Sequence, residues 1–363
     1  TAPCPSVDSA SAGEDGIVRY PVVLSTCGED PWITPLGASE GYAAVWVDRT
    51  SGGAEVFFRL LDPLGQPVPY QPEPVNVSDD FAESDMPALT WDPSGLRFGV
   101  AWLTHDTDDR TLLTVYFDVL DPSGTPLLSM PVELSPGPFT LTAGIDTAFG
   151  ERIEILSVNS PTFEGFAVTW VTDGGIWIAN IALGADGASV AEMTELDLST
   201  VMDTAGAILP SLAWADDRFV IAYSMVDPSG GKPSPDVMLA EVTRVPGPGL
   251  VAMPIDLVLA FTREATYPAI GWHDGLGELG LAWADGREGY GLREVRFTRL
   301  KLVDGPGSLV AQPVIDELSL TSPGVYAGGV TLGIEQGSGF SVAWTERSDD
   351  MVGARLGWLE CRR

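Results

Sequence analysis

The chain has 363 residues, 45% of them hydrophobic, and carries 51 acidic against 19 basic residues for a formal net charge of −32. A surface this acidic repels polyanions, so we expect neither a nucleic acid nor an anionic membrane surface as a partner. The sequence has no apolar run of 18 or more residues, which argues against a membrane-spanning helix and membrane insertion.

The N-terminal segment 1–15 is small, polar and contains Pro3 and Pro5. Such a leader is typical of a processed N-terminus, so we expect an exported protein that is secreted, periplasmic or at the cell surface. An oxidising compartment would also suit a structural disulfide.

An aromatic strand that ends in Trp or Tyr returns about every 60 residues along the chain. It reads GYAAVW at 41–46, RFGVAW at 97–102, GFAVTW at 165–170, RFVIAY at 218–223, LGLAW at 279–283 and FSVAW at 340–344. Each copy except the last is followed by a polar loop, a second apolar run, a turn and a version of Pro-Val-x-Leu-Ser. Short strands repeated at this period predict a closed radial array, that is, a β-propeller.

Each repeat reads as four antiparallel strands, with turns such as Asp-Pro-Ser-Gly between them. The predicted fold is therefore all-β: a single-domain, six-bladed β-propeller of four-stranded blades. The expected blades are 31–78, 86–135, 152–199, 209–259, 267–320 and 329–361. In the third blade, the expected fourth strand is ELDLS (195–199).

The last repeat lacks a fourth strand, and residues 16–25 supply one. Their end, PVVLS, precedes the first blade as PVNVS (74–78) precedes the second. We therefore expect this N-terminal strand to complete the sixth blade and close the ring, which removes exposed sheet edges.

Three cysteines, Cys4, Cys27 and Cys361, lie near the two ends of the chain. If residues 16–25 pair with the last strand, Cys27 lies at the far end of that strand from Cys361, beyond disulfide reach. We predict a Cys4–Cys361 disulfide with Cys27 unpaired. The alternative is Cys4–Cys27.

The loops after the second strand of each blade are variable and acidic, and they open on one face of the ring. The candidate ligand-binding residues there are Asp48, Asp106, Asp173, Asp285, Glu346, Arg287 and Tyr290. We expect a solvated loop face without a cofactor; the alternative is a ring of carboxylates that binds a structural Ca²⁺.

The two histidines, His105 and His273, are expected on opposite faces as surface residues, and no Cys/His cluster has zinc-ligand spacing. Most tryptophans sit at equivalent strand positions, which favours packing between blades over ligand stacking.

The stretches LAWADGREGYGLREVRFTRL (281–300) and AVWVDRTSGGAEVFFRLLDPLGQPV (44–68) resemble the repeats of secreted bacterial β-propeller proteins. The resemblance extends over nearly the whole chain at the level of the repeat. The layout is also similar to that of sialidase-like propellers, but the S-x-D-x-G-x-T-W box of those proteins is missing. The resemblance therefore implies a fold rather than an activity.

Because no catalytic motif is present, we expect an exported, non-catalytic and monomeric propeller that binds a protein or glycan partner through its acidic loop face. The alternative is a carbohydrate-active enzyme, a glycoside hydrolase or lyase, that uses loop-face carboxylates assisted by an Arg or Tyr290. A purely structural surface component is a third hypothesis.

Overall fold

The computed structural model describes residues 11–12, 18–19, 28–37, 40–49, 53–71, 73–78, 82–140, 153–160, 163–172, 175–184, 187–196, 207–225, 237–244, 250–257, 265–286, 293–305, 308–321, 326–335, 339–348 and 351–360. All regular elements in these ranges are β-strands, which confirms the all-β prediction. Within the same ranges, no helix is long and apolar enough to cross a membrane.

The first three sheets each contain four antiparallel strands in chain order. The first holds β3 (Gly28–Gly37), β4 (Gly41–Asp48), β5 (Glu55–Leu61) and β6 (Val75–Asn76). The second holds β7 (Ser84–Asp92), β8 (Arg97–His105), β9 (Leu113–Leu120) and β10 (Val132–Glu133). The third holds β11 (Glu154–Ser160), β12 (Phe163–Thr172), β13 (Gly175–Gly184) and β14 (Gly187–Glu195).

The next two groups of strands are joined into one nine-stranded sheet. The first group is β15 (Ala207–Ala215), β16 (Arg218–Met225), β17 (Val237–Arg244) and β18 (Leu250–Leu257). The second is β19 (Ala265–His273), β20 (Glu278–Asp285), β21 (Glu294–Asp304), β22 (Leu309–Pro313) and β23 (Leu318–Ser319). The groups meet where β18 pairs in parallel with β22. The last sheet contains β24 (Tyr326–Glu335), β25 (Gly339–Ser348) and β26 (Met351–Glu360).

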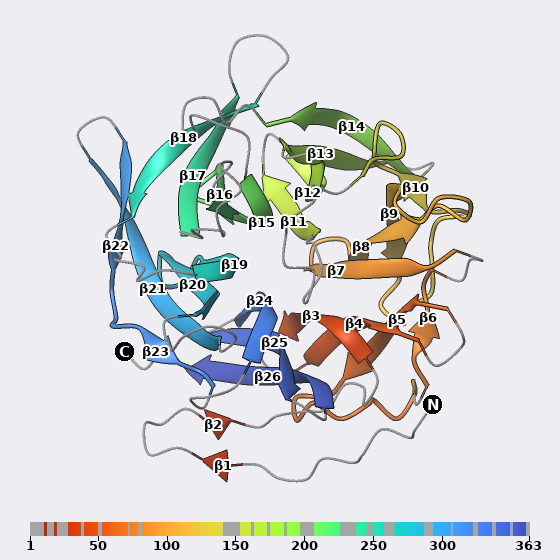
Figure 1. Ribbon diagram of the computed structural model, residues 1–363, viewed down its shortest axis with the longest axis horizontal. Helices are drawn as coiled ribbons and strands as arrows, with labels where there is room; N and C mark the ends of the chain where they lie inside the picture. Colours follow the sequence, from red (N-terminus) through yellow and green to blue (C-terminus); the bar gives the residue numbers. More distant parts are fainter. Residues whose placement is uncertain are drawn as a thin grey trace.

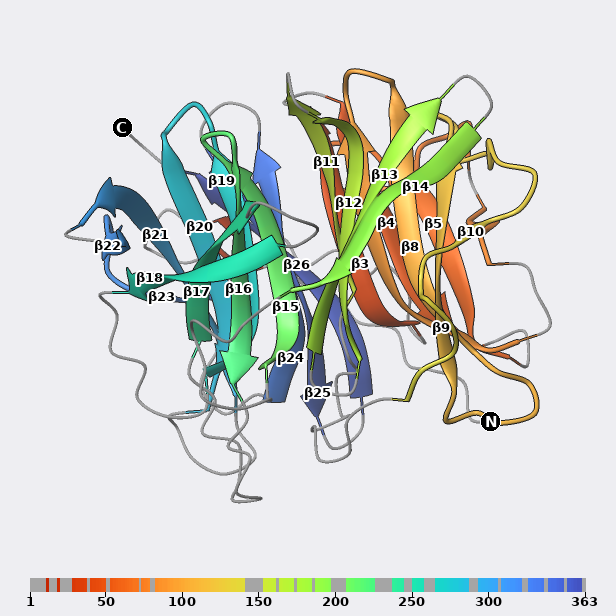
Figure 2. The same ribbon diagram turned by 90° about the horizontal axis from the view of Figure 1, so that it is seen from above.

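The first strands of these groups surround the centre of the molecule (Figure 1). They contact one another in the cyclic order β3, β7, β11, β15, β19, β24 and back to β3. Seen from the side, the sheets stand next to one another and their strands run between two opposite faces (Figure 2). Because the strands are antiparallel, the loops between second and third strands lie on the face opposite the turns between first and second strands.

The predicted strands agree with the observed ones in most places, and the largest difference is in the third sheet. Its fourth strand is β14, Gly187–Glu195, rather than the predicted 195–199. β14 pairs along β13 from Gly184–Gly187 to Trp177–Glu195, so the hairpin turns immediately after β13. The prediction followed the Leu-Ser ending and therefore missed a strand rich in small residues. The C-terminal end of the fifth expected blade (267–320) forms two short strands, β22 and β23.

The N-terminal prediction is only partly covered by the described residues. Within 16–25, the structure describes Val18–Arg19, which form β2 and pair with β1 (Ser11–Ala12). β2 lies next to β26, although no pairing between them is found in the described part (Figure 1). Strand closure by 16–25 therefore stays a prediction, and Cys4, Cys27 and Cys361 lie outside the described residues.

The repeated aromatic residue packs one sheet on the next. Ring pairs join the third strand of one sheet to the second strand of its neighbour, at centroid distances of 5.0–5.5 Å: Phe58–Phe98, Phe117–Phe166 and Phe297–Phe340. Gly99 and Gly280 lie directly beneath Phe166 and Phe340, where a Cβ atom would come within 2.8 Å and 2.5 Å of the ring. Aromatic packing between neighbouring sheets thus explains why an aromatic residue recurs in these strands. It also explains why glycine occupies the positions that face the rings of the next sheet.

The repeated Trp residues are core residues, as predicted. Trp102, Trp170 and Trp283 are at most 1% exposed, and Tyr223, which occupies the same position, is fully buried. Burial raises the pKa of Tyr223 to about 12. Trp170 also stacks on Trp177, one of the residues outside the repeat pattern.

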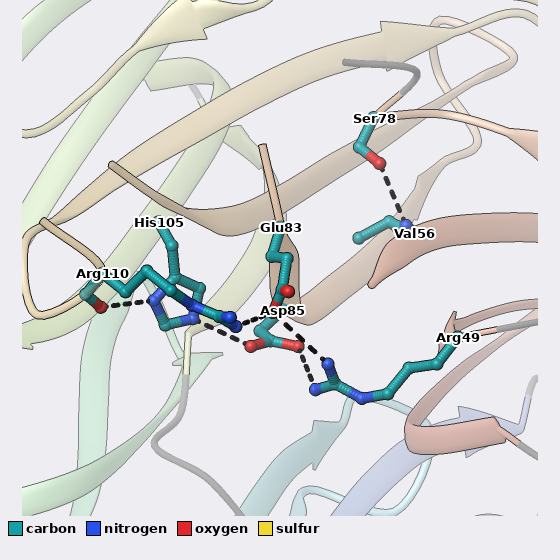
Figure 3. A network of polar contacts seen from close by, with 7 residues as sticks. All are labelled: Arg49, Val56, Ser78, Glu83, Asp85, His105 and Arg110. Atoms are coloured by element: carbon teal, nitrogen blue, oxygen red, sulfur yellow. Dashed lines mark hydrogen bonds and ion pairs between the residues drawn. The ribbon is translucent and has the colours of Figure 1, made fainter. Parts of the chain in front are cut away.

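The serine of the Pro-Val-x-Leu-Ser motif has a structural role. The Ser78 hydroxyl accepts a hydrogen bond from the Val56 backbone N–H (Figure 3). Ser135 does the same for Val115. Thr321 accepts from the N–H of Val295 in the equivalent place. Each hydroxyl therefore satisfies a buried backbone donor at the start of a third strand.

Candidate functional site

A cluster of five charged or titratable side chains lies where the first two sheets meet, on the face that carries the loops after the second strands (Figure 3). We call Arg49, Glu83, Asp85, His105 and Arg110 the loop-face cluster. Arg49 follows β4 in the first sheet. Glu83 and Asp85 stand at the entry to β7 in the second sheet, and His105 ends β8.

Asp85 is the centre of the cluster. Its Oδ1 accepts a hydrogen bond from the Arg49 guanidinium at 3.0 Å, and its Oδ2 lies 2.9 Å from Nε2 of His105. The Asp85 side chain is 14% exposed. Asp85 therefore joins the two sheets, because Arg49 follows β4 in the first sheet, whereas Asp85 and His105 both belong to the second.

Glu83 provides the second carboxylate. Its Oε2 lies 3.6 Å from the guanidinium of Arg49 and also forms a hydrogen-bonded ion pair with Arg110. Glu83 and Asp85 are two residues apart on an extended segment, so their side chains project to the same side. Both carboxylates contact Arg49, which holds them in one polar group.

His105 is held at both ring nitrogens. Nδ1 lies 2.8 Å from the backbone carbonyl oxygen of Arg110, and Nε2 faces Asp85. The hydrogen bond to the Asp85 carboxylate is the main reason that the pKa of His105 is raised above its ordinary value of 6.5; partial burial opposes the shift, and the Arg110 carbonyl adds to it.

The loop after His105 is ordered by its own polar groups. The Asp106 carboxylate accepts from the backbone N–H groups of Asp108 and Asp109 at 2.8 Å and 2.9 Å, and the Asp106 N–H donates to the Leu112 carbonyl. Asp106 therefore shapes the loop that carries Arg110, which is the role expected of Asp at such a turn.

The cluster is open to solvent in part. The exposed fractions of the side chains are 45% for Arg49, 29% for Glu83, 21% for His105 and 66% for Arg110. Two carboxylates and two or three cations thus offer acceptors and donors in a fixed arrangement. Such a group can bind hydroxyl groups through charge-assisted hydrogen bonds.

Two of the other predicted carboxylates are placed by the strand register. Asp48 ends β4 and lies opposite Glu55 in the strand register, and Glu346 lies in β25 opposite Ala327 and Gly353. Both are partly exposed. Asp173, Arg287 and Tyr290 lie outside the described residues.

Asp285 belongs to a buried group that we call the Arg296 cluster. Its side chain is 1% exposed, accepts a hydrogen bond from the Trp283 indole at 3.2 Å and lies 3.7 Å from the Arg296 guanidinium. Arg296 also lies 3.1 Å from Glu294 and 3.6 Å from Glu317. The expectation that Asp285 lines the solvated loop face therefore does not fit its burial: the strand register places Arg296 opposite Trp283, beside Asp285.

The expectation for His273 as a surface residue is wrong. His273 is 3% exposed, its Nδ1 accepts from the Leu276 N–H, and its ring meets Phe340 edge to face. It ends β19 before the turn 274–277, on the face opposite the loop-face cluster. The two histidines therefore lie on opposite faces, as the strand order predicts.

Metal binding finds no support in the described residues. Among them, no group of three or more His, Cys, Asp or Glu side chains is arranged to hold a metal ion. The Arg296 cluster, which contains three carboxylates, is already occupied by a guanidinium.

Sequence reasoning missed Arg49, Glu83, Asp85 and Arg110 as site residues and expected His105 only as a surface residue. Glu83 and Asp85 lie at the start of a first strand, whereas the residues named as candidates follow the second strands. A usable signal was present: two acidic residues at i and i+2 next to a predicted strand project to one side, on the same face as the loop that contains His105 and Arg110.

Comparison with known proteins identifies a fold. No protein-family model and no curated protein matches this sequence. Among solved structures, the chain is similar to a protein of unknown function from Dyadobacter fermentans, at 9% identity over 96% of this chain and 100% of that one, with a TM-score of 0.63. It is also similar to a sialidase from Trypanosoma rangeli, at 10% identity and a TM-score of 0.52, over 96% of this chain and 56% of the sialidase.

A GH43_1 enzyme from Xanthomonas citri is a more distant neighbour, at 10% identity and a TM-score of 0.43 over 94% of this chain and 91% of that one. At identities this low, structural similarity concerns the fold alone. The similarity to the sialidase supports a β-propeller-like fold for this chain.

Proposed function

We propose that the chain forms a six-bladed propeller and that this propeller acts on carbohydrate at the loop-face cluster. The closed cycle of contacts among six first strands supports the blade number. The parallel pairing of β18 with β22 joins the fourth and fifth blades at their outer edges, which accounts for their single sheet.

The observation that carries the carbohydrate proposal is the pair Glu83 and Asp85 bound to one guanidinium on the loop-bearing face. Glycoside hydrolysis uses two carboxyl groups on one substrate bond, one to donate a proton and one to stabilise the developing positive charge. The sialidase among the structural neighbours adds support at the level of the fold.

The cations give each carboxylate a role. Arg49 and His105 pair with the carboxylate of Asp85, which suits the group that faces the sugar carbon. Glu83 is more exposed and would transfer protons to and from the leaving oxygen and the attacking water. Arg49 and Arg110 keep exposed edges that can donate hydrogen bonds to sugar hydroxyls.

A second candidate is a glycan-binding module without catalysis. It is favoured by the completeness of the ion pairing, because both carboxylates and both nitrogens of His105 already have partners. Such a site is preorganised for binding, whereas a proton donor needs a carboxyl group that is protonated near neutral pH.

Turnover of a panel of aryl glycosides and unmodified oligosaccharides, with binding to a glycan array measured in parallel, tests these two candidates. If the protein is a hydrolase, Asp85→Asn and Glu83→Gln each lower turnover at least 100-fold, while Arg97→Gln on the opposite face does not. Binding without turnover identifies the second candidate. No turnover and no binding with any sugar contradicts both.

A further inference from the structure

His105 stands between two groups that can only accept hydrogen bonds. One is the backbone carbonyl of Arg110, and the other is the ionised carboxylate of Asp85. A neutral imidazole has one N–H and can serve only one of them, whereas the imidazolium donates to both. The observed geometry is therefore that of protonated His105.

These two bonds fasten a loop to its neighbouring strand. The carbonyl of Arg110 belongs to the loop 106–112, and Asp85 belongs to β7. The backbone N–H of His105 also donates to the backbone carbonyl of Glu83, and the side chain of Arg110 forms an ion pair with the Glu83 carboxylate. Together these contacts connect the end of β8 and the loop that follows it to the entry of β7.

The charges around the imidazole favour its protonated form. Asp85 faces it directly, Glu83 lies next to Asp85 on the same segment, and Arg49 and Arg110 are paired with these two carboxylates. Asp106, the remaining acidic neighbour on the loop, is used by the loop's own amides. The cluster has no excess positive charge until His105 is protonated.

We propose that His105 is a pH-operated latch: in its protonated form it fixes the loop 106–112 to β7, and on deprotonation it releases one of the two bonds and loosens this loop. The proposal does not depend on the carbohydrate activity. It concerns the order of a loop, which is measurable in the protein without any ligand.

The direction of the pH effect follows from the charge. Because the pKa of His105 is raised in the folded protein, the latch is fully formed below the ordinary value of 6.5 and is lost as the pH rises through the raised value. Each unit by which the pKa is raised corresponds to a tenfold difference in the latching equilibrium between low and high pH.

The experiment is an NMR titration of the imidazole ring signals. The chain has only two histidines, and His273 on the opposite face is the internal reference. We expect His105 to titrate above pH 6.5 in the wild-type protein, and to titrate at or below 6.5 in Asp85→Asn. A wild-type value at or below 6.5, or an unchanged value in Asp85→Asn, overturns the proposal.

Hydrogen exchange of the Asp106 and Leu112 amides tests the release of the loop. After correction for intrinsic rates, their protection should fall about tenfold for each unit by which the His105 pKa exceeds 6.5, across the same pH range as the titration. His105→Gln should abolish this step and leave the amides of Val100 and Ala101 in β8 unchanged. Protection that is independent of the titration of His105, or a step that persists in His105→Gln, overturns the latch.

Discussion

The loop-face cluster and the Arg296 cluster are made of the same residue types but lie in different surroundings. In the loop-face cluster, arginines that are 45% and 66% exposed meet carboxylates that are 14% and 29% exposed. In the Arg296 cluster, Arg296 is 15% exposed and meets Asp285 and Glu294 at 1% and 5%. The first group can meet a ligand, and the second is part of the core.

Comparison with the first sheet shows the role of Arg296 beside two opposed acidic residues. Asp285 and Glu294 are directly opposite each other, as are Asp48 and Glu55 in the first sheet. Like charges in this arrangement repel each other. In the first sheet, the position of Arg296 is taken by Phe57, which stacks on Trp46, and the acidic pair is partly exposed. Burial of such a pair therefore requires a compensating cation, which Arg296 provides.

We expect the largest effect from a substitution that breaks the Arg296 cluster. Arg296→Met leaves Asp285 and Glu294 opposed and uncompensated in the core, so we expect the free energy of unfolding to fall by about 3–5 kcal/mol. Urea unfolding at pH 7 measures it.

The matched control is Arg110→Met in the open cluster, where we expect a loss below about 1 kcal/mol because exposed ion pairs are weak. Adding Asp285→Asn and Glu294→Gln to Arg296→Met should restore most of the stability. Equal losses in Arg296→Met and Arg110→Met would contradict the distinction between the clusters.

A smaller effect concerns a buried carboxylate without a cation. Asp118 is 2% exposed, and burial raises its pKa from 3.8 to about 6, although the backbone N–H groups of Val119 and Leu128 donate to it. Since the folded protein holds the proton more tightly, Asp118 lowers stability as the pH rises from 3.8 through 6. Asp118→Asn should stabilise the protein by about 1–3 kcal/mol above pH 7 and have no effect near pH 3. The stability difference between the two proteins, measured from pH 4 to pH 8, checks this, and a gain that does not change with pH would be inconsistent with it.

The smallest effect concerns the latch. His105→Gln should lower the free energy of unfolding by less than about 1 kcal/mol at pH 5–6, and the difference should vanish near pH 9, where His105 is neutral. Thermal unfolding at both pH values, with Arg97→Gln as a pH-independent control, measures it. A stability difference between the wild-type protein and His105→Gln that increases with pH would contradict the latch.

The strands could be predicted because their signal is local. The aromatic strands from Tyr42 to Trp344 repeat in each unit, so one recognised unit identifies the others, and turns such as Asp-Pro-Ser-Gly at 92–95 and 121–124 mark strand ends. β14 was not predicted because it begins with small residues (Gly187, Ala188, Ser189) and lacks the Pro-Val-x-Leu-Ser motif. The parallel pairing of β18 with β22 was not predicted either, because it joins residues more than 50 positions apart and no sequence pattern marks the two strands as partners.

The site was harder to predict because its partners come from different sheets. The chain order placed His105 on the loop face, but the contact between Arg49 and Asp85 depends on how two neighbouring sheets are packed. Asp285 matched the loop-face pattern as well as Asp48 did, and the difference in its burial comes from Arg296 on the next strand. The residue on the facing strand, Arg296 in one sheet and Phe57 at the same register in the other, therefore separates the buried carboxylate from the open one.

The most direct test of the central claim, that the loop-face cluster is the functional site, is to follow the ring signals of both histidines while the most active sugar of the panel is added. The account predicts that the His105 signals shift with a saturable dependence on sugar concentration, that the His273 signals do not move, and that Asp85→Asn abolishes the shift. A sugar that is bound or cleaved while His105 stays unchanged would place the site elsewhere and contradict the account.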